Sequence, residues 1–158
     1  MNEIFQIKAI NPLYVISFNY TDTYKVYGIK PEDVFHVHGS LYKDNMVLGF
    51  NDDEPENLDF VYFKKYFQRM QKLTGYIDEL KLYYNGDAAL IHFYGHSMDK
   101  TDGDIIQKLR SMANGFVIYK YNQEDYEQKV INLIDVFGKK DATNMIQTGW
   151  IKFVPCKN

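Results

Sequence analysis

Three short clusters of polar residues in this sequence hold side chains that can do chemistry on a bound ligand. Asparagine and aspartate present oxygen atoms that stabilise positive charge, and a histidine imidazole accepts a proton near neutral pH. A glycine beside such groups lets a ligand approach the backbone. The clusters are residues 19–23 (Asn-Tyr-Thr-Asp-Thr), 36–40 (His-Val-His-Gly-Ser) and 95–102 (Gly-His-Ser-Met-Asp-Lys-Thr-Asp).

The clusters also have a purely structural interpretation. Asn, Asp, Ser and Thr are common in turns and helix caps, so Asp22, Ser97 and Asp102 can simply bond to nearby backbone amides. His36 and His38 stand two residues apart, so in an extended strand they point to opposite faces and at most one faces a common site. His92 lies in an apolar run and is typical of a hydrogen-bonded core histidine. With four histidines and one cysteine, we expect no metal site.

Strands and helices alternate in the second half of the chain. Apolar residues at three- and four-residue spacing predict the helices, and short apolar runs predict the strands. Gly115 is expected to turn the chain into a strand, Thr101 and Asp104 have the spacing of a capping box, and Gly138 is expected to end a helix. The predicted elements are a strand at 88–94, a helix at 102–113, a strand at 116–121, a helix at 122–137 capped by Asn122, and an edge strand at 150–154.

The first half is less regular. Residues 60–73 form the clearest amphipathic pattern, with Phe63, Tyr66, Phe67, Met70 and Leu73 expected on the buried face and a solvated basic face opposite. The other predicted elements are a strand at 13–18, a short helix at 21–27 ended by Gly28, brief strands at 34–37 and 46–48, an exposed loop at 51–57 and a helix at 77–84.

These elements predict an α/β fold, Rossmann-like, with a mostly parallel sheet flanked by helices. We expect the strands at 13–18, 88–94 and 116–121 to share one sheet within a single domain spanning residues 1–158. Ligands bind beyond the carboxyl ends of strands in open parallel sheets, which is where all three clusters fall. Asn19, His38, Gly95 and Ser97 are therefore expected to line one concavity.

Composition excludes several classes of protein. The chain is 46% hydrophobic and 25% charged with a net charge of −3, and it has no basic run, so we expect no nucleic-acid surface. No apolar stretch approaches the roughly 20 residues that span a bilayer, so no membrane contact is expected. Cys156 is the one cysteine, which leaves no disulfide framework and makes a reducing cytoplasm the expected location.

The segments VISFNYTDTYKVYG, VHGS, KKYFQRMQKLTGY and FYGHSMDKTDGDII, in this order and spacing, resemble the carboxy-terminal part of the AbiH family of bacteriophage abortive infection proteins. The resemblance runs from about Tyr14 to Phe137. A more distant likeness ties the clusters at Asn19 and His38 to sirtuin-like NAD-binding domains.

This resemblance implies a role for individual residues. Asn19 matches an asparagine that contacts the nicotinamide ribose, and His38 matches a histidine that acts as general base or orients the ribose hydroxyls, so these two are the expected catalytic residues. The expected nucleotide contacts, with NAD as the possible cofactor, are Asn19, Asp22, Gly39, Gly95, Ser97 and Asp102.

The sequence also departs from these families. The single cysteine cannot supply the four-cysteine zinc site of common sirtuin deacetylases, so deacetylation is not expected. The glycine-rich strand and loop of AbiH relatives, Gly-Asn-Gly-Phe-Asp, does not occur here. We therefore expect the chain to be a fragment of a larger domain and inactive by itself.

Three interpretations stay open: part of a phage-defence effector whose intact form binds and hydrolyses NAD like a glycohydrolase, a non-catalytic nucleotide-sensing or protein-interaction module, and a folded remnant. The expected partners are a nucleotide ligand and either a phage-derived trigger or further copies of the chain.

Overall fold

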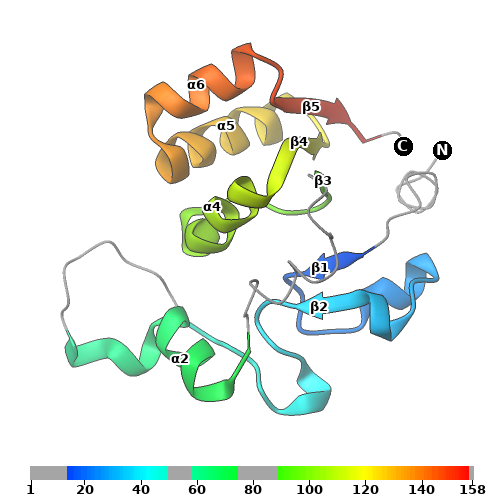
Figure 1. The fold of residues 1–158 in the computed structure, drawn as a ribbon, viewed down its shortest axis with the longest axis vertical. Coiled ribbons are helices and arrows are strands. Elements are labelled where there is room, and N and C mark those ends of the chain that lie inside the picture. The colour runs from blue at the N-terminus through cyan, green and yellow to red at the C-terminus, as the bar shows by residue number, and fades with distance from the viewer. Residues whose placement is uncertain (1–13, 50–57, 75–88, 157–158) are drawn as a thin grey trace. The chain divides into compact units, whose positions relative to one another are not determined.

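A computed structural model describes residues 14–49, 58–74 and 89–156 (Figure 1). Contacts divide the chain into two compact units, one of Met1–Tyr76 with Lys157–Asn158 and one of Ile77–Cys156. Each unit combines parallel strands with helices, and each is described by itself. The α/β fold with parallel sheets flanked by helices is confirmed.

A two-stranded parallel sheet forms the centre of the first unit. It consists of β1 (Val15–Ser17) and β2 (Val34–His36), and its register pairs Ser17 with His36, so both strands end at the same edge. One further ladder bond, from the Val37 N–H to the Ser17 carbonyl oxygen at 3.0 Å, extends the pairing past this edge. The polar residues that follow β1 and β2 are thereby brought side by side.

Short 3-10 helices surround these strands. The predicted helix at 21–27 is the 3-10 helix η1 (Thr23–Tyr27), and Gly28 ends it with a φ of 72°, as expected. Two further 3-10 helices, η2 (Pro31–Asp33) and η3 (Leu41–Lys43), flank β2. The predicted strand at 46–48 pairs with no other strand in the part of the chain that the structure describes.

Residues 60–73 do not form one helix. They are divided between the 3-10 helix η4 (Leu58–Phe63) and the α-helix α2 (Lys65–Lys72), because Lys64 between them has extended backbone angles. Gly49 packs directly against this junction: a Cβ there would lie 2.1 Å from the carbonyl oxygen of Phe63. The close approach of another segment fixes the break that the apolar periodicity did not predict.

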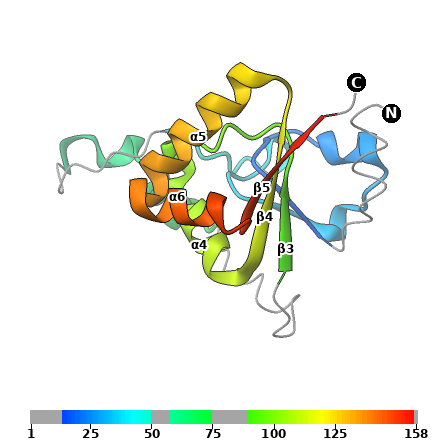
Figure 2. The same cartoon turned by 90° about the horizontal axis from the view of Figure 1, so that it is seen from above.

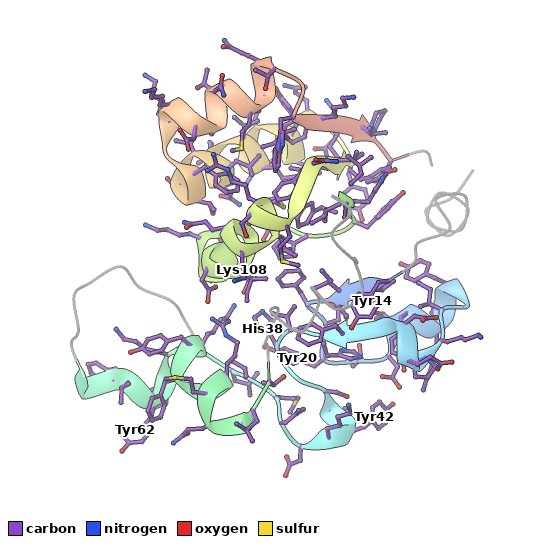
Figure 3. The ribbon with its side chains drawn as sticks, viewed as in Figure 1. Tyr14, Tyr20, His38, Tyr42, Tyr62 and Lys108 are labelled. Atoms are coloured by element: carbon purple, nitrogen blue, oxygen red, sulfur yellow. The ribbon has the colours of Figure 1, made fainter. Side chains whose placement is uncertain are left out.

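The buried face of α2 is also the reverse of the prediction. Gln68 hydrogen bonds to both the N–H and the carbonyl oxygen of Leu48, at 2.8 and 2.6 Å, and Lys72 donates to the carbonyl oxygen of Met46. These polar contacts hold the basic side of α2 against residues 46–49 and turn the apolar side outward. The buried residues are Lys64, Lys65 and Arg69. Of the five residues expected to be buried, Phe67 is half-buried and the other four, Phe63, Tyr66, Met70 and Leu73, are exposed. Tyr62 projects from η4 (Figure 3).

The second unit is a three-stranded parallel sheet in the order β3–β4–β5, with its helices on one side (Figure 2). The order along the chain places a helical connection between each pair of neighbouring strands, as predicted for parallel crossovers. The elements are β3 (Ala89–Phe93), the 3-10 helix η6 (Lys100–Asp102), α4 (Gly103–Met112), β4 (Ala113–Lys120), α5 (Gln123–Phe137), α6 (Lys139–Gln147) and β5 (Ile151–Pro155).

An apolar core fills the space between this sheet and its helices. Phe93 and Phe116 meet edge to face with ring centroids 4.8 Å apart, and Phe153 of β5 packs in the same way on Tyr126 of α5 at 4.7 Å. Fully or nearly fully buried residues here are Ile105, Ile106, Leu109, Phe116, Ile118, Leu133, Met145 and Ile151.

Local predictions in the second unit have mixed outcomes. The edge strand at 150–154 is confirmed as β5, and the Asn122 side chain caps α5 by accepting the Asp125 N–H at 2.8 Å.

Gly115 lies inside β4 rather than at a turn, because α4 runs directly into β4; a Cβ on it would lie 3.0 Å from the Trp150 carbonyl oxygen. The N-cap residue of α4 is Asp102, so the predicted Thr101–Asp104 capping box stays a prediction. Asp99 accepts the N–H of Thr101 at 2.8 Å and Asp104 accepts that of Ile105.

One sheet shared by the strands at 13–18, 88–94 and 116–121 stays a prediction, since the first of them lies in a different unit from the other two. β1 pairs with β2, whereas β3 and β4 belong to the three-stranded sheet. The segment between Ser17 and Val34 is long enough for a parallel crossover, which needs about a dozen residues, so β1 finds its partner in the next strand along the chain. The predicted loop at 51–57 and helix at 77–84 lie outside the described residues.

Candidate functional site

The carboxyl edge of β1 and β2 brings Asn19 and His36 together. The Nδ1 atom of His36 lies 3.0 Å from the main-chain oxygen of Asn19. Because a carbonyl oxygen only accepts, Nδ1 carries the proton in this bond, and Nε2 of the neutral ring is left as an acceptor. His36 also packs edge to face on Tyr24, at 5.8 Å between ring centroids. These two contacts fix the ring in an orientation suited to accepting a proton at Nε2.

The Asn19 side chain is exposed and held at one end. Its Nδ2 donates to Thr23 Oγ1 at 3.3 Å, at the start of η1. The main chain is anchored as well, since Ser17 Oγ bonds to both the N–H and the carbonyl oxygen of Asn19, at 3.3 and 3.4 Å. The amide oxygen is thereby oriented at a solvent-accessible position.

His38 follows β2 in a turn and is 3% exposed. Its ring lies between Phe18, at 5.7 Å and nearly perpendicular, and Tyr20, at 6.3 Å (Figure 3). The main chain is fixed too, because the Val47 N–H donates to the His38 carbonyl oxygen at 2.8 Å and the Tyr20 hydroxyl donates to that of Val47. His38 is thus part of an aromatic core, and the two histidines contact different neighbours.

Asp22 and Gly39, the other expected nucleotide contacts of the first unit, are occupied locally. The Asp22 carboxylate pairs with Lys25 Nζ at 2.6 Å, which raises the pKa of the lysine through their hydrogen bond. Gly39 has a φ of 75°, and a Cβ there would lie 2.1 Å from the carbonyl oxygen of Asn45. The turn requires glycine at this position because backbone fills the space of a side chain.

The second unit carries the third cluster as a loop from Gly95 to η6. His96 organises it: its Nδ1 accepts the Met98 N–H at 2.9 Å, and its Nε2 lies 3.5 Å from Asp102 Oδ2. The proton is therefore on Nε2, the opposite arrangement from His36. Gly95 has a φ of 62°, and among the described residues an added Cβ would have only the Tyr121 hydroxyl within 4 Å. Here the backbone is accessible to a ligand.

Helix α5 supports this loop. Asn132 Nδ2 donates to the Ser97 carbonyl oxygen at 2.8 Å, while Ser97 Oγ accepts the Asp99 N–H at 3.3 Å. The Ser97 hydroxyl thus bonds to a nearby backbone amide, as expected if its role is structural. Its side chain is nevertheless exposed.

A buried ion pair stands at the carboxyl end of β4. Lys129 is 3% exposed and bonds to Asp125, which also accepts the Tyr121 N–H at 2.9 Å. Burial by itself raises the pKa of the Asp125 carboxyl, but the hydrogen bonds from Lys129 and Tyr121, with the charge of Lys129, outweigh it and lower that pKa. Sequence reasoning missed this pair and His96; the four-residue spacing of Asp125 and Lys129 on a helix was the available signal.

Histidine outside the clusters behaves as a core residue. His92 Nδ1 lies 3.3 Å from the Tyr119 hydroxyl, and burial lowers the pKa of His92. Across residues 14–49, 58–74 and 89–156, no group of three or more His, Cys, Asp or Glu side chains could hold a metal ion.

A comparison with protein families decides the chain's relationship. The family model described as bacteriophage abortive infection AbiH matches residues 2–121, which include all three polar clusters. The chain belongs to the AbiH family. Among the curated proteins and the solved structures, nothing matches it.

Membership gives this AbiH protein a role in abortive infection by bacteriophage. The matched region ends just after β4, so α5, α6 and β5 follow it. None of the helices in the described parts of the chain is long and apolar enough to cross a membrane. Asn19 and His38 fall in one unit, and Gly95, Ser97 and Asp102 in the other. Their meeting in one concavity stays a prediction.

Proposed function

We propose that this AbiH protein, in its intact form, acts in abortive infection by binding NAD or a related nucleotide and hydrolysing its nicotinamide–ribose bond. The observation that carries the proposal is the bond between His36 Nδ1 and the Asn19 main-chain oxygen, at the carboxyl edge of two parallel strands. Ligands of open parallel sheets bind at such edges. The distant likeness of this segment to sirtuin-like domains supplies the substrate class.

The two residues have complementary tasks in this reaction. When the bond between the ribose carbon and nicotinamide breaks, its electron pair leaves with nicotinamide and positive charge builds on the sugar. An oriented Asn19 amide oxygen stabilises that charge. Water attacks the sugar carbon, and its proton goes to the Nε2 atom of His36, so the products are nicotinamide, ADP-ribose and a proton.

His36 takes the role that the resemblance assigned to His38. A general base has to reach its substrate within hydrogen-bond distance, and His38 is 3% exposed between two aromatic rings. His36 is only half-buried, and its Nδ1 proton is already committed to a carbonyl oxygen. His38 then acts by positioning the turn after β2.

The alternative is a nucleotide-sensing module without turnover. The burial of His38 favours it, because the residue aligned with the catalytic histidine is used for packing. In this case a nucleotide binds at the strand edge that carries Asn19 or at the loop that carries Gly95. Binding then sequesters the nucleotide or changes how the protein binds a partner. The two functions differ in whether NAD is consumed.

The deciding experiment measures NAD binding and NAD consumption separately on the intact protein and on the variants His36→Gln, Asn19→Ala and His38→Phe. We expect His36→Gln to bind NAD normally and to consume it at least about a hundredfold more slowly, the usual contribution of a general base. His38→Phe keeps the ring and serves as the matched control, with near-parental consumption.

Each result has a distinct meaning. Binding without consumption by the parent protein supports the sensing module, and equal consumption by the parent and by His36→Gln overturns the role of His36. Failure to bind NAD or any adenine dinucleotide overturns the proposal.

A further inference from the structure

A shallow, open cavity of about 260 Å³ lies in the second unit, at the edge of the sheet opposite the Gly95 loop. Its lining residues lie where α4 passes into β4 and where α6 leads into β5, at the amino ends of both strands; Figure 2 shows these elements. Most of its lining comes from residues beyond 121, past the part of the chain that matches the AbiH family. The lining residues are Arg110, Ala113, Asn144, Met145, Thr148 and Trp150.

Arg110 is held in place on the α4 side. Its Nη2 donates to Asp141 Oδ2 of α6 at 3.0 Å, and its guanidinium lies 5.3 Å from the ring centroid of Phe137. A guanidinium has five N–H donors in one plane, and the bond to Asp141 uses one of them. The ion pair is half-exposed and uses one donor, so other donors remain for a ligand in the cavity.

The α6 side supplies hydrogen-bonding groups of both kinds. Asn144 and Thr148 are four residues apart and so lie on one helix face. The Thr148 hydroxyl donates to the Asn144 main-chain oxygen at 2.8 Å, so its own oxygen is oriented as an acceptor. The Asn144 side-chain amide offers a donor and an acceptor side by side, an arrangement that pairs with adenine in base recognition, so any preference for guanine comes from Arg110.

Trp150 adds an aromatic wall. Its indole packs on Phe116 of the core, with ring centroids 4.7 Å apart and planes at 53°, so the ring is supported from the interior. Ala113 is small and leaves room near it. A rigid aromatic surface beside donors and acceptors is the usual setting for a planar heterocycle.

The electrostatics disfavour a simple anion. The charge of Arg110 is already balanced by Asp141, and both α4 and α6 end near the cavity, at Met112 and Gln147. Helix carboxyl ends carry partial negative charge and repel phosphate or carboxylate. Their carbonyl oxygens suit a ligand with amine donors. The volume also lies just below the roughly 300 Å³ at which sites for larger ligands begin, which suits one base and not a dinucleotide.

We propose that this cavity binds a purine base, with guanine preferred, at a site separate from the Asn19 and Gly95 edges. Arginine donors pair with the O6 and N7 acceptors of guanine, and Asn144, Thr148 and Trp150 complete the contacts. The ligand is a guanine nucleoside or nucleotide, recognised through its base.

The single tryptophan makes the test direct, because Trp150 is the only source of indole fluorescence in the chain. Guanosine, adenosine, cytidine and inorganic phosphate are titrated separately into the full chain while this fluorescence and the heat of binding are recorded. We expect saturable quenching by guanosine, weaker quenching by adenosine and none by cytidine or phosphate. For Arg110→Lys, guanosine binding falls about tenfold or more, within the range for loss of one bidentate arginine–base contact.

Asp141→Asn is the matched control, because it removes the ion pair and leaves all six lining residues in place. Guanosine binding by this variant at parental strength or tighter supports the proposal. The absence of saturable quenching and heat up to millimolar guanosine overturns it, as does unchanged binding by Arg110→Lys. Quenching by phosphate equal to that by guanosine also overturns it, in favour of an anion site. NAD binding by Arg110→Lys stays at the parental level, so this test is independent of the proposed NAD site.

Discussion

The side-chain amide of Asn132, in the middle of α5, donates to the main-chain oxygen of Ser97 at 2.8 Å and fastens the helix to the polar loop after β3. Gln128 supports the same amide by donating to Asn132 Oδ1 at 2.9 Å. Asn132 is buried, so the bond is shielded from water. The loop that carries Gly95 and Ser97 is therefore set by a residue outside the AbiH-matched part of the chain.

We expect Asn132→Ala to destabilise the protein by about 1 kcal/mol, because a part-buried hydrogen bond to the Ser97 carbonyl oxygen is lost. Urea denaturation measures the change. Asn144→Ala on exposed α6 is the control and should change the free energy of unfolding by less than about 0.5 kcal/mol. Equal stability of Asn132→Ala and the parent would show that the loop is held by other contacts.

A comparison of Gly28 with Gly39 separates two costs of adding a side chain at a positive φ: backbone strain and steric overlap with neighbouring atoms. Gly28 and Gly39 have nearly the same φ, 72° and 75°, but an added Cβ meets nothing at Gly28 and lies 2.1 Å from Asn45 at Gly39. We expect Gly28→Ala to cost about 1 kcal/mol from strain alone. Gly39→Ala should cost several kcal/mol or prevent folding, because backbone must move. Similar unfolding midpoints for the two variants would contradict this packing.

The fold class followed from the sequence because its signals were local. Helix α5 has a capping residue, Asn122, and a terminal glycine, Gly138, and its apolar spacing is regular. Such elements are defined by their own residues. The prediction of the buried face of α2 was wrong for the opposite reason. This face is set by hydrogen bonds from Gln68 and Lys72 to the distant segment 46–49, and the periodicity of apolar residues carries no information about such contacts. Strand pairing has the same limit, because the spacing of residues in β1 does not indicate which strand it pairs with.

The positions of the polar clusters after strands were predicted from the sequence, whereas the surroundings of their individual side chains were not. The clusters do follow strands, and Asn19 is exposed at a parallel edge. Sequence alone ranked His38 above His36 because the resemblance aligned it with a catalytic histidine. Burial and ring orientation, which decide whether an imidazole can reach a substrate, depend on Phe18, Tyr20 and Tyr24 and are not visible in residue spacing.

Stability should fall in mild acid partly through His92. Burial lowers the pKa of His92 below its ordinary value of 6.5, so between the folded and unfolded pKa the unfolded chain binds more protons. Its contribution is therefore complete above pH 6.5 and is lost as the pH falls toward the folded pKa. The free energy of unfolding, measured in urea at pH 7.5 and 5.5, should decrease less in His92→Gln than in the parent. An identical decrease in both proteins would exclude His92 as the cause.

His38 provides a final comparison, between packing and chemistry at one position. Because its ring is 3% exposed between Phe18 and Tyr20, we expect His38→Ala to leave a cavity and to cost about 2–4 kcal/mol, in the range for truncating a buried ring. His38→Phe fills that space and should cost less than about 1.5 kcal/mol, as volume-conserving changes do. Thermal and urea unfolding of both variants give the two costs, and NAD consumption is measured at a temperature where both are folded. Retained consumption in His38→Phe with strong destabilisation in His38→Ala identifies a packing residue. A stable His38→Ala protein that consumes no NAD would instead return the role of general base from His36 to His38.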